Sequence, residues 1–175
     1  MAILGVDDFK SKLGGGGARP NLFKATINFP SYANGDVEFT SFMVKGAGLP
    51  ASVVNTIEVP FRGRQLKIAG DRTFESWTIT VLNDVDMKVR NSFETWMNGI
   101  NEHANNTGLS NPSDYQADLI VEQLDKDGNV TKKYDIRGAF PVNISQIDLS
   151  YDSGDAIEEF TVELQYQYWE SNTTS

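Results

Sequence analysis

Residues 66–84 read LKIAGDRTFESWTITVLND, and this stretch decides the fold class. Within it, Trp77, Ile79 and Val81 alternate with serine and threonine side chains. An alternation with a period of two is typical of a β-strand that has one buried and one polar face. The sequence therefore predicts a core strand over residues 74–82.

The period of the apolar residues changes directly after this strand. Six apolar side chains now recur three and four positions apart: Val85, Val89, Phe93, Trp96, Met97 and Ile100. This spacing predicts an amphipathic α-helix with one face in the core. Asn83 or Asp84 is the expected N-cap, because both side chains can accept a hydrogen bond from the first turn.

Strand-like alternation recurs on both sides of this unit, separated by glycine, proline and asparagine clusters that favour turns. The expected strands cover residues 23–29, 37–44, 53–61, 66–68, 115–122, 130–136, 142–149 and 157–168, with a slip at Ser145-Gln146. The predicted fold class is mainly β: two packed antiparallel sheets of about eight strands, as a sandwich or barrel, with one flanking α-helix.

The hairpin formed by residues 53–68 is the first candidate functional segment. Its tip shows apolar residues on both faces, whereas a solvated hairpin keeps one face polar. We expect the rest of the domain or another subunit to cover it. The candidate contact residues are Leu49, Val53, Val54, Ile57, Val59, Phe61, Arg62 and Arg64. Lys67 and Arg72 add positive charge that suits an acidic partner surface.

Residues 1–19 are expected to form a flexible N-terminal arm ahead of a single domain, residues 20–170, and a C-terminal tail, residues 171–175. The arm carries Val6, Phe9 and Leu13 at spacings of three and four, followed by four glycines that cannot sit in a packed element. Such an arm can fold against a neighbour. The alternative is a frayed terminus.

Composition excludes several classes of protein. The chain of 175 residues has no cysteine, which excludes disulfides and thiolate metal sites. Its net charge of −9 disfavours a surface that binds nucleic acid, because such surfaces use Lys and Arg to neutralise phosphates. No apolar run approaches the ~20 residues of a membrane span, and a secretory signal is not expected.

The sequence offers no catalytic or cofactor-binding constellation, so we expect neither an enzyme nor a bound metal or cofactor. His103 is the only histidine, and it has no second nitrogen ligand nearby. Asp125, Asp127 and Asn129 resemble the start of a calcium loop, but Val130 occupies the position of the required glycine. A hairpin turn at Asp127-Gly128 is the better interpretation.

Residues 66–84, with their Gly-Asp-Arg-Thr-Phe and Trp-Thr core, resemble the tail tube proteins of contractile-tailed, T4-like bacteriophages. Residues 18–23 and the segment Tyr168-Trp169-Glu170 match the opening and the end of the same family. The resemblance covers residues 18–170 in order. It also extends to the related tube proteins of contractile injection systems.

The resemblance implies a structural subunit that forms hexameric rings with one continuous inner β-barrel. The rings would stack into a hollow conduit through which viral DNA passes without specific binding. The implied partners are further copies of the chain, a sheath protein outside, and baseplate and terminator proteins at the ends. The implied location is the virion, after assembly in the host cytoplasm. The hairpin and the arm become contacts between rings.

The acidic charge gains a role in such a tube, because carboxylates that face the lumen would repel phosphate. The candidates on strands expected to line the lumen are Glu38, Asp118, Glu122 and Asp135. The main alternative function is a tube or effector-carrier ring of a type VI-like or other injection system. A ligand-binding β-sandwich, which would stay monomeric and have an aromatic-lined cleft, is a second alternative.

Overall fold

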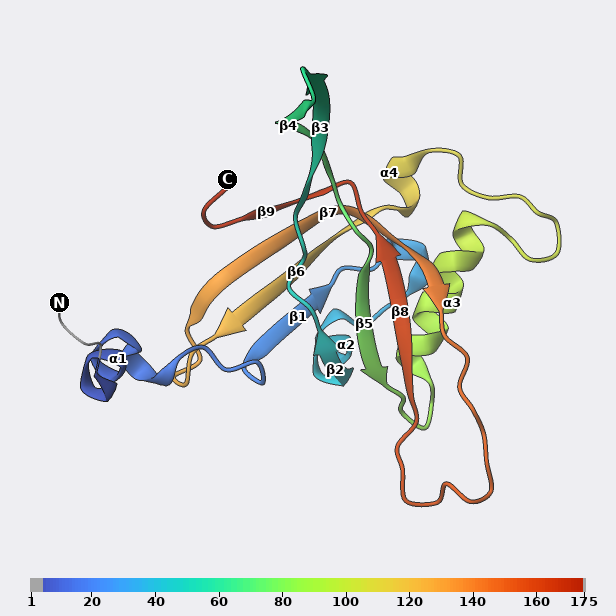
Figure 1. Cartoon of the computed structure of the whole chain (residues 1–175). Coiled ribbons are helices and arrows are strands. Elements are labelled where there is room, and N and C mark those ends of the chain that lie inside the picture. The colour runs from blue at the N-terminus through green and yellow to red at the C-terminus, as the bar shows by residue number, and fades with distance from the viewer. Residues whose placement is uncertain (1–4, 175) are drawn as a thin grey trace.

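The computed structural model describes residues 5–174 and consists mainly of antiparallel strands (Figure 1). Seven described strands form one sheet in the order β1-β6-β7-β8-β5-β2, with β9 paired to β7, and β3 and β4 form a second, two-stranded sheet. The strands are β1 Phe23–Ile27, β2 Val44–Ala47, β3 Val53–Phe61, β4 Arg64–Thr73, β5 Trp77–Leu82, β6 Ala117–Leu124, β7 Val130–Ile144, β8 Glu159–Gln165 and β9 Tyr168–Ser171. The predicted mainly β class is confirmed, with nine described strands instead of about eight.

Strand β7 joins the two halves of the seven-stranded sheet. Its residues 134–137 lie between β6 and β9, whereas residues 140–144 pair with β8. Gly138 lies between these two parts with φ +64°, and a Cβ atom there would come 2.8 Å from the Gln167 side chain. Because glycine tolerates this backbone conformation and leaves room for its neighbour, the long strand can change partners at this point.

The core lies between the sheet and helix α3, Lys88–Ile100 (Figure 1). Val89, Phe93 and Trp96 of α3 are buried against the alternate apolar residues of the central strands, as the sequence predicts. The Trp96 indole Nε1–H donates to the carbonyl of Tyr115 at 2.7 Å, which satisfies its buried polar group. The flanking helix is therefore fixed by packing and by a hydrogen bond.

The start of this helix differs from the prediction. Helix α3 begins at Lys88, and Val85, expected on its apolar face, is fully exposed. A separate turn precedes the helix, because the Met87 N–H donates to the Asp84 carbonyl at 3.0 Å. Asp84 Oδ1 accepts from the Lys88 N–H at 2.9 Å, so Asp84 still bonds to the first turn from outside the helix.

Residues 37–43, expected to form a strand, form helix α2, Val37–Met43. Asp36 is its N-cap: Oδ1 accepts from the Phe39 N–H at 3.0 Å, and the Asp36 carbonyl accepts from the Thr40 hydroxyl at 2.6 Å. Phe39 and Met43 are four residues apart, so they fit a helix as well as an alternating strand. The capping aspartate decides between the two structures.

Two expectations near the C-terminus are also wrong. No separate strand forms over residues 142–149, because β7 continues to Ile144 and residues 145–158 form a loop. The expected slip at Ser145-Gln146 is the end of β7, and the register shift lies between Pro141 and Asn143. The long strand expected over residues 157–168 is divided, since β8 ends at Gln165 and β9 begins at Tyr168.

The described helices are short. Besides α2 and α3, they are α1 Val6–Lys12 and α4 Pro112–Tyr115, with 3₁₀ turns over Gly14–Gly16 and Ser31–Ala33. Across residues 5–174, none of the helices has the length and apolar character needed to cross a membrane.

Candidate functional site

Strands β3 and β4 form a hairpin that projects from the body of the protein (Figure 1). Phe61 pairs with Arg64, so the turn has two residues, Arg62 and Gly63, with φ of +47° and +81°. Positive φ at both central residues is typical of the type I′ turn, whose twist suits a two-residue hairpin. The hairpin predicted from the sequence is confirmed.

The register places the large apolar side chains of the hairpin on one face. Ile57 lies opposite Ile68, whereas Glu58 lies opposite Lys67, and paired residues share a face of an antiparallel ladder. The expectation of apolar residues on both faces near the tip is therefore wrong, because consecutive residues point to opposite faces. The apolar face is uncovered; its members are Ile57, Val59, Phe61, Leu66 and Ile68, which are 40–66% exposed.

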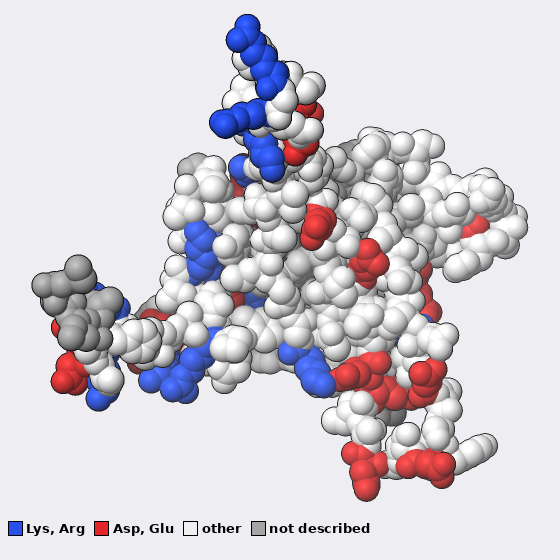
Figure 2. All heavy atoms as spheres, in the orientation of Figure 1, with Lys and Arg blue, Asp and Glu red and all other residues white. Residues whose placement is uncertain are grey.

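The remaining predicted contact residues lie around this face. Leu49 is in the segment before β3, Val54 is on β3, and both are more than 40% exposed, whereas Val53 is half-buried. Basic side chains gather at the tip and along the hairpin, as Figure 2 shows; they are Arg62, Arg64, Lys67 and Arg72. The hairpin thus combines an uncovered apolar strip with positive charge.

The predicted N-terminal arm forms helix α1 and the glycine turn after it, and none of its described residues is buried. Val6, Phe9 and Leu13 are 71%, 64% and 43% exposed. The body of the fold begins near residue 19, where Gln123 Nε2 donates to the Arg19 carbonyl at 2.7 Å. The arm therefore presents an uncovered apolar stripe of its own.

The predicted lumen carboxylates do not form one acidic surface. Glu38 is exposed on helix α2, so its expected position on a strand is wrong. Asp118 lies on β6 and accepts from Arg137 Nη1 at 2.9 Å, and Asp135 lies on β7 within 3.3 Å of Lys133 Nζ. Each of these two carboxylates therefore has a basic neighbour in the same chain.

Glu122 completes this face of the sheet, which points away from the buried side chains of β6. Its cross-strand partners are Lys24 on β1 and Lys133 on β7. The face also contains Glu170 on β9, which approaches Arg137 Nε at 3.5 Å. Four carboxylates and three basic groups thus nearly balance, and the net charge of −9 must arise elsewhere in the chain.

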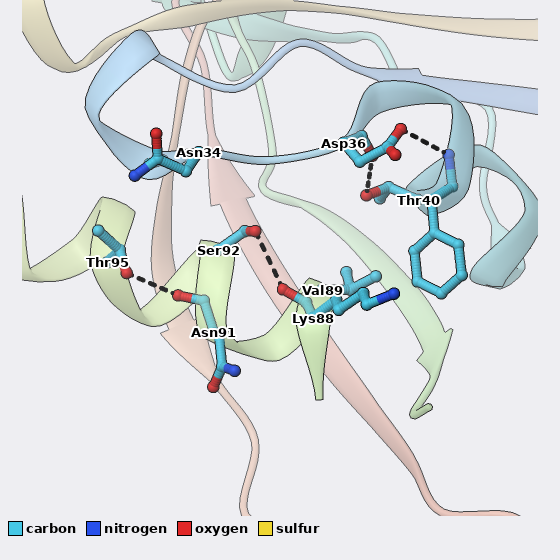
Figure 3. Close-up of a pocket in the computed structure, with 10 residues that line it drawn as sticks. Asn34, Asp36, Thr40, Lys88, Val89, Asn91, Ser92 and Thr95 are labelled. Carbon is cyan, nitrogen blue, oxygen red and sulfur yellow. Dashed lines mark hydrogen bonds between the residues drawn. The ribbon is translucent and has the colours of Figure 1, made fainter. Parts of the chain in front are cut away.

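A hollow of about 290 Å³ separates helices α2 and α3 (Figure 3). Its polar groups already make local bonds: Asp36 caps α2, the Ser92 hydroxyl donates to the Lys88 carbonyl, and the Thr95 hydroxyl donates to the Asn91 carbonyl. These bonds fix the two helices instead of converging on a common point. This hollow was not predictable from the sequence pattern, which indicated a strand where α2 lies.

A larger groove of about 580 Å³ follows the free edge of β1 beside α2. Its apolar lining includes Phe23, Val37 and Phe42, and Phe42 is 76% exposed. Strand β1 pairs only with β6, and β2 pairs only with β5, so both outer strands of the described sheet keep an unpaired edge. Such edges pair readily with another chain.

The turn at Asp127-Gly128 is a hairpin turn, as predicted. Asp125 Oδ1 accepts from the N–H groups of Asn129 and Asp127 at 2.8 and 2.9 Å. These bonds, with those of Asn129 first in importance, hold the pKa of the Asp125 carboxyl below its usual value. Among residues 5–174, no group of three or more His, Cys, Asp or Glu side chains could hold a metal ion.

Comparison with known proteins places this architecture in a family. Residues 18–172 match the family described as phage tail tube protein. The tail tube protein gp19 of Enterobacteria phage T4 is 38% identical over 154 residues, which cover 87% of this chain and 91% of that protein. A tail tube protein of Serratia phage KSP90 is 34% identical over 165 residues, which cover 92% of this chain and 93% of that protein. The chain therefore belongs to the phage tail tube protein family, which confirms the resemblance seen in the sequence.

Solved structures share the fold at lower identity. A chain of the six-fold symmetrised baseplate of the anti-feeding prophage superposes with a TM-score of 0.66 at 14% identity, covering 88% of this chain and 94% of that chain. A chain of the sheath–tube complex of an extracellular contractile injection system superposes with a TM-score of 0.62 at 14% identity, covering 93% of this chain and 96% of that chain. These similarities establish the fold, whereas the phage relatives establish the family.

Proposed function

We propose that the chain assembles into rings of six subunits, and that the rings stack into the hollow tube of a contractile phage tail. The observation that carries this proposal is the hairpin, whose apolar face is left uncovered by residues 5–174. Burying such a face would gain roughly 25 cal/mol per Å² of apolar surface, and only another molecule can provide that burial. The hairpin is therefore the contact between stacked rings.

Ring closure is supported by the two free edges of the seven-stranded sheet. Joining the β1 edge of one subunit to the β2 edge of the next would pair both of these strands and produce one continuous barrel. This contact is heterologous, and it closes when the rotation between subunits is one sixth of a turn. The chain of the same fold in a six-fold symmetrised baseplate supports that number.

The face of the sheet opposite α3 would then line the lumen. In the β5–β8 ladder this face presents threonines and a carboxylate but no basic group, since Thr78 lies opposite Glu163 and Thr80 opposite Thr161. The nearly balanced face that contains Asp118, Glu122 and Asp135 continues it. A lumen of this kind offers DNA phosphates few cations to bind, so viral DNA would pass through without specific contacts.

The proposed partners outside the tube are a sheath protein around it and baseplate and terminator proteins at its ends. Among the similar folds, structures named for a baseplate, a tube-terminating cap and a sheath–tube complex support these classes of partner. The proposed location is the virion, after assembly in the host cytoplasm. The phage relatives at 34–38% identity favour a phage tail over an injection-system tube.

Negative-stain electron microscopy of the concentrated protein tests this function directly. Rings with six-fold symmetry and tubes built from them are expected. A species that stays monomeric at all salt and protein concentrations would contradict the proposal.

A further inference from the structure

The hairpin needs a receptor, and we propose that this receptor is the acidic loop, residues 145–158, of a second copy of this chain in the next ring. The inference rests on the proposed tube and names the surface that receives the hairpin. It follows from the position, the charge and the exposed apolar residues of the loop.

The hairpin and the acidic loop leave the body at opposite ends of the same pair of strands. The hairpin leads into β5 at Trp77, which pairs with Leu164, and the loop leads into β8 at Glu159, which pairs with Leu82. Five residue steps along β5 separate these two ends by roughly 17 Å. In Figure 1 the hairpin lies at the top of the molecule and the loop at the bottom. A hairpin that points out of one ring therefore faces the loops of the next.

The acidic loop is opposite in net charge to the hairpin, whose four basic residues outnumber Glu58 and Asp71. It contains Asp148, Asp152, Asp155 and Glu158, and it contains no Lys or Arg. Figure 2 shows acidic groups gathered at this end of the molecule and basic groups at the opposite end, on the hairpin. Complementary potentials of this kind steer two surfaces together and fix which end meets which.

The loop also supplies apolar surface to match the hairpin. Leu149, Tyr151 and Ile157 are 80%, 109% and 70% exposed. The loop and its flanks enclose a hollow of about 310 Å³ whose lining includes Leu149 and Ile157. The loop thus combines a carboxylate rim with uncovered apolar side chains, as the hairpin combines an apolar strip with cations.

Lys67 pairs with Glu58 within the hairpin, but most of the charged groups on both surfaces have no ion-pair partner among the described residues. Among residues 5–174, no salt bridge involves Arg62, Arg64 or Arg72 of the hairpin. Within the same described range, none involves an aspartate of the acidic loop. The two surfaces can therefore form new ion pairs between copies without breaking existing ones.

The other candidate receptor is the groove beside β1, but it fits the hairpin less well. Its charged residues are Lys24 and Glu38, which cancel. It also follows a side edge of the sheet, where the neighbour in the same ring would bind. The acidic loop matches the hairpin in charge, and it lies at the end of the molecule where the next ring begins.

A charge-reversal exchange tests the pairing. The hairpin variant carries Arg62→Glu and Arg64→Glu, and the loop variant carries Asp152→Lys and Asp155→Lys. Each variant alone is expected to form rings but to need at least tenfold more protein to form tubes, because like charges then meet between rings. An equimolar mixture is expected to recover tubes, since the reversed hairpin fits the reversed loop and the two native surfaces fit each other.

The control is Asp114→Lys with Asp127→Lys, which adds the same charge away from the loop and should leave tube formation unchanged. A loop variant that forms tubes at the wild-type concentration, or a mixture that recovers nothing, would overturn the inference. Wild-type protein that forms neither rings nor tubes would contradict the proposed function itself. The two failures are therefore distinguishable.

Discussion

Asn83 holds the end of the acidic loop through two hydrogen bonds to Glu158. Its Nδ2 donates to Glu158 Oε2 at 3.1 Å, and its backbone N–H donates to the Glu158 carbonyl at 2.8 Å. Asn83 is only 8% exposed, and its Oδ1 has no hydrogen-bond partner among the described residues. The base of an otherwise exposed loop is thus fixed to the end of β5.

Asn83→Asp should destabilise the protein by about 2–3 kcal/mol, because it buries a carboxylate against the Glu158 carboxylate and removes the donor between them. Urea denaturation at neutral pH measures this loss. Adding Glu158→Gln should restore most of it, since the glutamine amide can donate to the new carboxylate. A single variant as stable as the wild type would show that the Asn83 side chain does not hold the loop.

Ile57→Asp and Val59→Asp should each block tube formation and leave a folded monomer. Both residues are on the uncovered face of the hairpin, so a charge there costs little in the monomer but is left buried in a stacked contact. Sedimentation measures assembly, and circular dichroism measures folding. Leu109→Asp, an exposed apolar residue on the loop after α3, is the matched control and should assemble normally. Normal tubes from both hairpin variants would exclude the hairpin as the stacking element.

Features with a long, unambiguous period were predictable from the sequence. The alternation in β5 and the three-four spacing through Val89, Phe93 and Trp96 both appear where they were expected. The hairpin of β3 and β4 was also predictable, because a short basic and glycine-containing segment separates two apolar runs. These elements are encoded by local residue patterns that do not depend on distant partners. Together with the resemblance, they defined the fold and the family.

Short elements and features that depend on distant partners were not predictable. Val37–Met43 is too short for its period to separate helix from strand, and only the Asp36 cap decides. The length of β7 depends on its change of partner at Gly138, which no local pattern encodes. The pairing of Asp118 with Arg137 likewise joins two strands, so the sequence alone suggested a more acidic face than the structure has.

The turn at Asp125 should make stability depend on pH. The pKa of Asp125 is lower in the folded protein than in the unfolded chain, so the ionised carboxylate stabilises the fold. This contribution is complete above the usual aspartate pKa of about 4, and it is lost as the pH falls through the lower folded value. Asp125→Ala should therefore lower the melting temperature at pH 7, and the difference from the wild type should shrink near pH 2.

Thermal denaturation followed by circular dichroism at pH 7, 5, 3 and 2 measures this dependence. Asp127→Ala removes a neighbouring carboxylate whose side chain makes no hydrogen bond within residues 5–174, and it should show a smaller effect. A constant difference at every pH for Asp125→Ala would contradict the assigned role of its ionised form.

Cations placed on the proposed lumen face should make the tube retain DNA. Thr78→Lys with Thr161→Lys adds two positive charges per subunit to the β5–β8 face. Wild-type tubes should not retain DNA at physiological salt, whereas the variant should bind it, with affinity falling steeply as salt rises. Asn91→Lys with Thr95→Lys adds the same charge to exposed positions of α3. Equal binding by both variants would place the DNA outside the tube and contradict the proposed lumen.

Deleting residues 2–17 should separate folding from assembly. Helix α1 has no buried residue, so removing it should change the free energy of unfolding by less than about 0.5 kcal/mol. Tube formation should need more protein, because Val6, Phe9 and Leu13 would no longer be available to pack on a neighbouring subunit. Phe9→Ser should reproduce this effect in the full chain, whereas Lys10→Ser, beside it on α1, should not. If the deletion leaves assembly unchanged, the arm is not a contact between subunits; if it unfolds the protein, the domain boundary near residue 19 is wrong.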